Sequence, residues 1–439
     1  MPVKLDKKIR SLIKRDRKVM LTTTREPYPY DFVPEHGEGD YVYDISGNRF
    51  IDFSSFIAVY NFGVNSRAAV REAMKKQMDS LIHPAFTDYY AELPVVFAEK
   101  LVRMLPRSFG RVFFSNSGTE ANEAAIKFSR LFTKRQYIIS FYGAFHGRTM
   151  GSLSLTASKT VHRERFGPFN STVQAPYAYC YRCPLHKEES ECCLQGIDVI
   201  RNQILGKTVS EKECAAIFFE PVQGEGGYVV PPKEFVTELR KLADEHGILL
   251  VADEVQSGYM RTGRFLALDH FGVEADIYTF AKAIAGGMPM GATVTRKSLG
   301  DIPSGAHANT FGGNLIAVAA ANANIDYIKR NMASLKRDSK EKGSLIMKRL
   351  NQMKERYEIV GDVRGLGMMI GVELVKNKRT KEPAIKEREG ILDYCFENNL
   401  ILLPAGISTI RIVPPLTMSK QNIEKGLDVL EAAIKKFSA

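Results

Sequence analysis

Ile248-Leu249-Leu250-Val251-Ala252-Asp253-Glu254-Val255-Gln256 and Asp276-Ile277-Tyr278-Thr279-Phe280-Ala281-Lys282 are the two stretches that decide the fold. Each contains a short apolar run that leads to a charged side chain. Such runs, flanked by segments of helical character, are typical of buried strands in a parallel sheet. The sequence therefore predicts that Asp253 and Lys282 lie at the carboxyl ends of neighbouring strands, where open α/β sheets bind ligands.

An acid and an amine in these positions are what pyridoxal 5′-phosphate (PLP) requires, because a carboxylate pairs with its pyridine nitrogen and a lysine binds its aldehyde. With these stretches the chain resembles the class III (ω-amino-acid) aminotransferases of PLP fold type I, over nearly its whole length. The resemblance is closest to the 4-aminobutyrate and acetylornithine aminotransferase branch. It implies an α/β fold with a large, doubly wound, mostly parallel sheet domain and a smaller α/β domain made from the two chain ends.

The order of strand-like and helix-like segments agrees with this fold, because their alternation is the signature of βαβ units. Strands are predicted at 112–115, 137–141, 216–219, 248–252, 277–280, 292–295 and 368–374, and a strand, turn and returning strand over 41–53. We expect an N-terminal segment at 1–69, a large PLP-binding domain at 70–325 and a small C-terminal domain at 326–439.

Composition is that of an ordinary soluble enzyme: 439 residues, 44% hydrophobic and 25% charged. The net charge of +11 is diffuse apart from an N-terminal cluster, and no nucleic-acid-binding motif accompanies it. Leu5, Ile9, Leu12 and Ile13 predict a basic amphipathic helix, which could lie on a membrane or pack on its own protein; the pattern favours the second. We expect a cytoplasmic enzyme with no membrane or nucleic-acid partner.

A phosphate site is predicted where Ser117-Gly118-Thr119-Glu120 opens a helix after the strand at 112–115. Ser117 can cap this helix, and Glu120 completes a capping box. A helix start offers free N–H groups and a positive dipole end, both of which favour a phosphate. A capped helix without a ligand has the same pattern, so the assignment of Ser117, Gly118 and Thr119 to the PLP phosphate comes from the resemblance.

The contacts of the PLP ring are likewise implied by the resemblance. Phe145, in Ala144-Phe145-His146-Gly147-Arg148, would stack on one face of the ring, and Val255 would pack on the other. Stacking of this kind contributes on the order of 1 kcal/mol and fixes the ring plane. Gln256 would reach the phenolic oxygen.

Asp253 and Lys282 are the predicted catalytic residues. Asp253 would bond the pyridine nitrogen and keep it protonated, which makes the ring a better electron acceptor. Lys282 would bind the cofactor and then move a proton at the substrate carbon, and burial favours the neutral amine that this role needs. Glu254 should point the opposite way, because successive side chains of a strand alternate.

A homodimer with shared active sites is implied by Thr310, in Ala308-Asn309-Thr310-Phe311-Gly312-Gly313. In the family the threonine of this turn reaches the phosphate of the neighbouring subunit's cofactor. Such a contact requires an interface at the active site.

The resemblance implies that Arg148, Glu225 and Arg411 recognise carboxylates. Arg148 would bind a substrate carboxylate, a task that suits its planar two-pronged donor set. Glu225, in the motif that begins at Glu220, would pair with Arg411 and release it when the α-carboxylate of 2-oxoglutarate or glutamate needs a cation. A purely structural ion pair is the alternative.

The amino donor is predicted from Ile57, which stands where ornithine-specific members carry tyrosine. After Gly63, Val64-Asn65-Ser66 departs from the family's His-x-His-Pro near the substrate entrance. We expect an aminotransferase that moves the terminal amino group of an ω-amino acid, such as 4-aminobutyrate, to 2-oxoglutarate. Two alternatives stay open: an amino-acid racemase of the same fold, and an acetylornithine or ornithine aminotransferase.

Four of the six cysteines, Cys180, Cys183, Cys192 and Cys193, lie close together in the sequence. Their spacing is compatible with a zinc knuckle or a disulfide, but an adjacent pair is awkward for tetrahedral coordination. Buried thiols are favoured, and no metal site is predicted.

Overall fold

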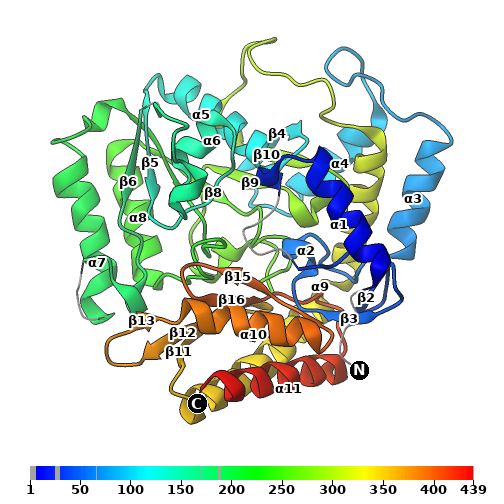
Figure 1. Ribbon diagram of the computed structural model, residues 1–439. Helices are drawn as coiled ribbons and strands as arrows, with labels where there is room; N and C mark the ends of the chain where they lie inside the picture. Colours follow the sequence, from blue (N-terminus) through cyan, green and yellow to red (C-terminus); the bar gives the residue numbers. More distant parts are fainter. Residues whose placement is uncertain (1–5, 25–29, 66, 170, 186–188, 439) are drawn as a thin grey trace.

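The computed structural model describes residues 6–24, 30–65, 67–169, 171–185 and 189–438, without the side chains of 189–193. Its centre is a seven-stranded sheet in the order β4-β10-β9-β8-β7-β5-β6 (Figure 1). The strands are β4 (Phe109–Ser115), β5 (Tyr137–Phe141), β6 (Thr172–Ala175), β7 (Cys214–Phe219), β8 (Leu249–Asp253), β9 (Ile277–Phe280) and β10 (Gly291–Arg296). Strand β10 runs antiparallel to β4 and β9, and the other pairs are parallel.

The helices alternate with these strands and then form about half of the chain's last third. They are α1 (Lys7–Val19), α2 (Ser55–Ala58), α3 (Ala68–Met78), α4 (Glu92–Val102), α5 (Gly118–Thr133), α6 (Met150–Leu155), α7 (Glu189–Val199), α8 (Lys233–His246), α9 (Leu315–Arg356), α10 (Ile385–Glu397) and α11 (Lys420–Phe437).

Helices bury both faces of the large sheet. Successive side chains of a strand point to opposite sides, so each strand contributes to both of these cores. Ile138 and Val251 pack in a cluster with apolar residues of α5. Their chain neighbours, Ile139 and Ala252, belong to the main core, together with residues of α8 and α9. Strands buried on both faces are apolar throughout, and their positions can therefore be predicted from the sequence.

The predicted doubly wound sheet is confirmed, and so are its six predicted strands, with limits that shift by up to three residues. Strand β6 was not predicted. It is the edge strand of the sheet, and its Thr-Val-Gln-Ala sequence is only partly buried, so it lacks the apolar run that marks the others.

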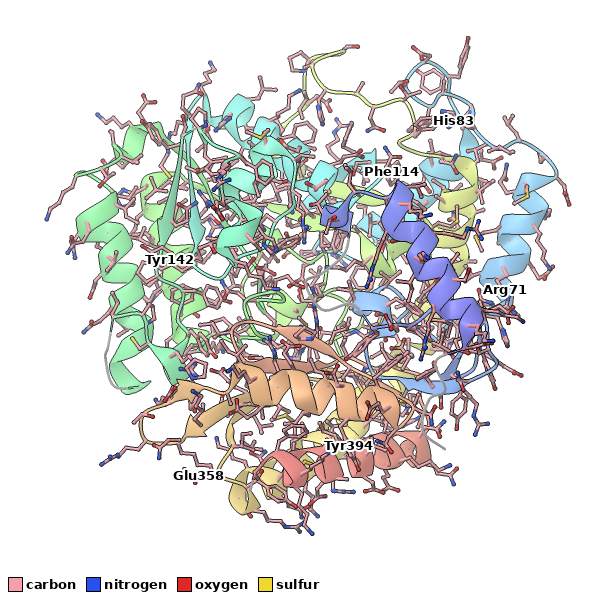
Figure 2. All side chains as sticks on the ribbon, in the orientation of Figure 1. Arg71, His83, Phe114, Tyr142, Glu358 and Tyr394 are labelled. Carbon is pink, nitrogen blue, oxygen red and sulfur yellow. The ribbon has the colours of Figure 1, made fainter. Side chains whose placement is uncertain are left out.

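Two smaller sheets complete the fold. One has the order β11-β12-β16-β15, with β13 paired to β12; the other has the order β1-β2-β3-β14 and joins the two chain ends. These strands are β1 (Pro34–Glu38), β2 (Tyr41–Asp44), β3 (Arg49–Asp52), β11 (Val360–Leu366), β12 (Met369–Asn377), β13 (Glu382–Pro383), β14 (Leu400–Ile401), β15 (Leu403–Ala405) and β16 (Thr409–Ile412). The predicted strand pair over 41–53 and the strand at 368–374 are thereby confirmed. Helices α10 and α11 pack together, and Tyr394 extends from α10 in this region (Figure 2). Lys436 of α11 lies 5.0 Å from the ring centre of Tyr394.

Helix α9 runs across the domain boundary predicted at 325 and bends at Asn331, whose backbone leaves the helical region. Helix α1 buries Ile9 while Leu12 stays exposed; Leu5 lies outside the described residues. In the described part of the chain, no helix combines the length and the apolar character needed to cross a bilayer.

Candidate active site

A cavity of about 460 Å³ opens where β8 and β9 end. It brings together most of the predicted site residues, as the residues that line it include Ser117, Gly118, Thr119, Phe145, Arg148, Asp253, Val255, Gln256 and Lys282. Glu254 does not line it. Its carboxylate accepts hydrogen bonds from the Ser257 hydroxyl (2.6 Å) and the Leu268 N–H (2.9 Å), on the other side of the strand end.

Ile57 and Thr310 are not brought to this cavity. Ile57 lies in α2, whose four residues all have positive φ between 46° and 65°, so this turn is left-handed and strained for non-glycine residues. The Ile57 side chain is 42% exposed, and Val59 at the end of the turn lines the cavity instead. Thr310 lies on an exposed loop.

Asp253 is held at the base of the cavity by a polar network that the sequence did not reveal. Its Oδ2 accepts hydrogen bonds from Asn122 Nδ2 and from His146 Nδ1, each at 2.8 Å, and its Oδ1 accepts one from the Val255 N–H at 3.0 Å. Because a carboxylate can only accept, the proton of His146 must sit on Nδ1. Asn122 is oriented in turn by the Thr279 hydroxyl, 2.8 Å from its Oδ1.

His146 and Glu220 extend the charge of this network. Burial lowers the pKa of His146, but its hydrogen bond to Asp253 and the attraction of Asp253 and Glu220 outweigh burial, so the pKa is raised. Burial raises the pKa of Glu220 to about 7, even though its carboxylate accepts the N–H groups of Phe145 and Gly224 at 3.0 Å each. Both residues belong to motifs that the sequence pointed out, but their roles depend on partners far away in the chain.

Lys282 follows β9 directly, with a positive φ of 45°, and begins a short 3-10 turn. Burial lowers the pKa of its amine, although Asp253, Glu225 and Glu220 raise it. A buried amine with a lowered pKa is more readily neutral, which a lysine needs in order to attack an aldehyde or accept a proton.

The start of α5 has the predicted cap but not the predicted capping box. The Ser117 hydroxyl accepts the Glu120 N–H at 3.3 Å, as expected. The Glu120 carboxylate, however, reaches the N–H of Asn116 at 2.6 Å and also its side-chain amide at 3.0 Å, rather than returning to Ser117. The Glu120 carboxylate is therefore held at Asn116, before the helix begins. Gly118 and Thr119, whose N–H groups have no acceptor within the helix, line the cavity.

These residues fit PLP. The N–H groups at a helix start suit a phosphate, and a side chain at Gly118 would come within 2.9 Å of Val255 Cγ1, so glycine keeps this cradle open. Gln256 Oε1 is buried and has no hydrogen-bond partner among the described residues, a cost that a ligand group in the cavity would remove. Asp253 is 4% exposed and suited to a buried cationic ring nitrogen.

Glu225, which is partly buried, and Arg411, which is buried, form an ion pair beside this cavity. Arg411 Nη1 donates to Glu225 Oε1 at 2.6 Å, and Lys159 Nζ lies 3.7 Å from Glu225 Oε2. Burial alone would raise the pKa of Glu225, but Arg411, Lys159 and Lys282 hold it at about 2. The glutamate is therefore a carboxylate at every working pH.

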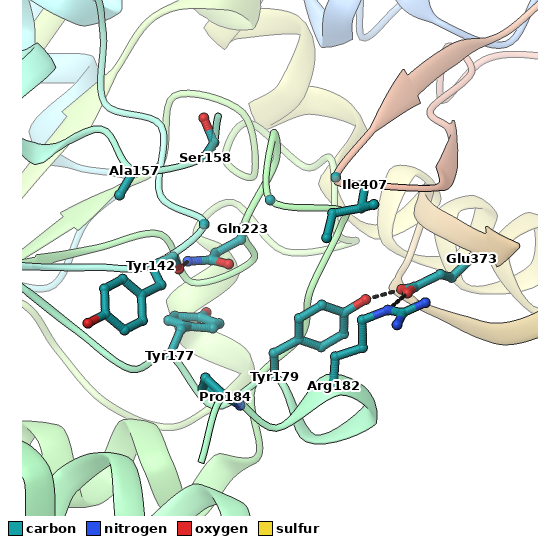
Figure 3. Close-up of a pocket in the computed structure, with 13 residues that line it drawn as sticks. Tyr142, Ala157, Ser158, Tyr177, Tyr179, Arg182, Pro184, Gln223, Glu373 and Ile407 are labelled. Carbon is teal, nitrogen blue, oxygen red and sulfur yellow. Dashed lines mark hydrogen bonds and ion pairs between the residues drawn. The ribbon is translucent and has the colours of Figure 1, made fainter. Parts of the chain in front are cut away.

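A second, smaller cavity of about 210 Å³ is lined in part by Gln223 and Gly226, from the loop that also carries Glu225 (Figure 3). At one end, Tyr179 and Arg182 donate to Glu373 of β12, and Arg364 lies 2.7 Å from the same carboxylate. This cluster fastens the segment at 177–184 to the small domain.

Cys180 and Cys183 lie in that segment, and the side chains of Cys192 and Cys193 lie outside the described residues. Among the side chains that are described, no three His, Cys, Asp or Glu residues are grouped so as to hold a metal ion.

Comparison with known proteins identifies the family. The chain has the fold of an amine transaminase from an uncultivated Pseudomonas species, solved in a PLP-bound form, with a TM-score of 0.88 and 29% identity over 95% of this chain and 98% of that one. A model of the class III aminotransferases matches residues 23–434. The chain belongs to this family, has the PLP fold type I, and takes PLP as its cofactor, so these three predictions are confirmed.

Its relatives have different activities. A leucine/methionine racemase of Thermococcus litoralis is 41% identical over 90% of this chain and 88% of the racemase. A probable 4-aminobutyrate aminotransferase of Bacillus subtilis is 38% identical over 91% of this chain and 92% of that protein. The comparisons thus define the family without fixing the substrate.

The His146–Asp253 contact predicts a pH-dependent stability of the cofactor-free protein. Because the folded pKa of His146 is raised above its unfolded value of about 6.5, its contribution is complete below that value and is lost as pH rises through the folded pKa. His146→Gln should therefore lower the free energy of unfolding more at pH 6 than at pH 9, by roughly 1–3 kcal/mol at the lower pH. Urea unfolding at both pH values measures this. An equal loss at both would show that the imidazole is neutral.

Proposed function

We propose that the protein transfers the terminal amino group of an ω-amino acid, such as 4-aminobutyrate, to 2-oxoglutarate. The observation that carries this proposal is the 2.6 Å contact between Arg411, which is buried, and Glu225, which is partly buried. While the contact holds, Arg411 is neutralised and cannot attract the α-carboxylate of an α-amino acid. A donor whose carboxylate is remote from its amine does not need that cation, whereas 2-oxoglutarate does.

The side chains around the cavity have separate tasks in this reaction. PLP, when bound, accepts the electron pair that the substrate carbon keeps when it loses its proton. Asp253, oriented by His146 and Asn122, supplies the negative charge that a protonated ring nitrogen requires. Lys282 holds and moves the proton at the reacting carbon, and Arg148 binds the remote carboxylate of the donor.

An amino-acid racemase is the second candidate, favoured by the similarity to the leucine/methionine racemase. Racemisation needs a proton donor on each face of the substrate carbon. Glu225 is close enough to Lys282 for their charges to interact, but with a pKa of about 2 it has no proton to give while Arg411 holds it. Glu225 therefore does not supply the second proton donor while the ion pair is closed.

The two functions separate in one experiment with the purified PLP-loaded enzyme. It should form glutamate from 2-oxoglutarate with 4-aminobutyrate, and should leave single enantiomers of leucine, methionine and alanine unchanged when no keto acid is present. Coupled glutamate detection and chiral chromatography measure the two outcomes. Inversion of an amino acid without a keto acid, and no transfer from any terminal amine, would replace the proposal with the racemase.

We further propose a cytoplasmic homodimer with shared active sites. Thr310 is exposed and outside its own chain's cavity, as a residue that serves a partner's phosphate should be. Light scattering should give the mass of at least two chains, and Thr310→Ala should weaken PLP retention without changing that mass. Full retention of PLP would remove Thr310 from the site.

A further inference from the structure

A groove of about 440 Å³ lies apart from the active-site cavity, where three segments meet. These are the loop at 262–270 after β8, the middle of α9, and residues 365–367, where β11 ends and the turn to β12 begins. Four basic side chains line it: Arg264, His270, Lys336 and Lys340. No acidic residue is among the described residues of its wall.

The positive charge of this groove is not balanced by ion pairs. In the described part of the chain, Arg264, Lys336 and Lys340 have no carboxylate within 4.0 Å, whereas many other basic residues of the protein do. Lys336 and Lys340 stand four residues apart on α9, a spacing at which like charges repel and destabilise a helix.

The acidic residues nearby neutralise little of the positive charge of the groove. Asp338 lies between the two lysines in the chain, and its Oδ1 is 3.6 Å from Arg337 Nη2. Asp269 attracts Arg264 but does not line the groove. Burial lowers the pKa of His270, and the charges of Arg264 and Lys336 lower it further, so a positive field acts inside the groove.

The form and chemistry of the groove define a class of ligand. Its volume is within the range of small-molecule sites. Lysines act as point charges for phosphate oxygens, and an arginine adds directed N–H donors. Arg264 Nη1 already donates to the Asp269 carbonyl oxygen at 2.8 Å, which fixes the direction of the guanidinium group.

We propose that this groove binds a small soluble anion with more than one phosphate charge, for which pyrophosphate is the simplest probe. The anion would connect the large domain, through Arg264 and His270, to α9 and to the β11–β12 turn of the small domain. Since it binds only where these segments meet, it should stabilise the folded protein by mass action.

The test uses the PLP-loaded enzyme, in which the cofactor already fills its own phosphate site. Titration calorimetry with pyrophosphate should show saturable binding that weakens with added salt, because screening acts on exposed charges. The double variant Lys336→Gln/Lys340→Gln should weaken this binding by about ten-fold or more, as expected for the loss of two charge contacts. Pyrophosphate should also raise the melting temperature of the wild type more than that of the variant.

The matched control is Lys329→Gln/Lys425→Gln, which removes the same charge from exposed lysines that do not line the groove. Its affinity should equal that of the wild type. Equal weakening in both variants, no saturable binding, or inhibition by pyrophosphate that is competitive with 2-oxoglutarate would each overturn the proposal. The last of these would place the anion in the active site.

Discussion

Replacing Lys282 by alanine should reduce aminotransfer by about 10⁴-fold or more. Proton transfer by a positioned group alone accounts for roughly 10²–10⁴-fold, and the covalent hold on the cofactor is lost as well. Two other titratable side chains among the described residues that line the cavity are already engaged: His146 with Asp253 at 2.8 Å, and Glu220 with the N–H groups of Phe145 and Gly224 at 3.0 Å each. Lys282 is partly buried, and desolvation lowers its pKa, which suits both tasks.

The wild type should have a visible absorption band that borohydride removes, and Lys282→Ala should lack it. Added methylamine should restore part of the proton transfer in the variant, because a small free amine can replace the side chain. Lys207→Ala, at an exposed position outside the cavity, serves as the control and should keep both the band and the activity. A reducible band that survives in Lys282→Ala would show that another lysine binds the cofactor.

The sheet and the ends of its strands could be predicted because burial on both faces makes a strand apolar throughout. The position of Asp253 and Lys282 follows directly from where those runs stop. The edge strand β6 was missed because its partial burial leaves no such run. The prediction for the start of α5 is only partly correct. Ser117 caps the helix as predicted, but the Glu120 carboxylate accepts the N–H of Asn116.

The network around Asp253 could not be predicted from the sequence, for a different reason. Asn122 lies in α5, His146 in the loop after β5, and Thr279 in β9. Only the packing of α5 on the sheet brings these residues together. No spacing along the chain encodes these contacts. The strained turn at Ile57 is similar, because four positive φ values in non-glycine residues contradict local preference and must be stabilised by contacts such as that of the Ser55 hydroxyl with the Val413 carbonyl oxygen, at 2.6 Å.

The Glu225–Arg411 pair predicts opposite changes of substrate preference in two variants. Glu225→Gln should leave Arg411 available at all times, so α-amino acids such as alanine should compete better as amino donors. Arg411→Ala should weaken 2-oxoglutarate most, by about 2–5 kcal/mol in kcat/KM, because a desolvated charge contact is lost. 4-Aminobutyrate, which we expect to be bound through Arg148, should be affected least.

Single-turnover spectra with 4-aminobutyrate, ornithine, alanine and glutamate measure the two half-reactions separately. Arg411→Ala also leaves Glu225 with only the weaker attraction of Lys159, at 3.7 Å, and of Lys282. The melting temperature and cofactor band of the variant must therefore be compared with those of the wild type before a kinetic loss is assigned to binding. Arg411→Lys keeps the charge but not the two-pronged donor set. Its kcat/KM for 2-oxoglutarate should therefore lie between those of the wild type and Arg411→Ala.

The pH dependence of these preferences separates a switch from a simple titration. The pKa of Glu225 is held at about 2, below its ordinary value, so the stability that the pair contributes is present above the unfolded pKa and is lost only as pH falls towards 2. Between pH 5 and 9 the pair should therefore not titrate, and donor preference in the wild type should be constant. Opening of the pair must then be driven by the arriving α-carboxylate, which exchanges one carboxylate partner of Arg411 for another. Unchanged preferences in both Glu225→Gln and Arg411→Ala would show that the pair is only structural, and would remove the main support for a terminal-amine donor.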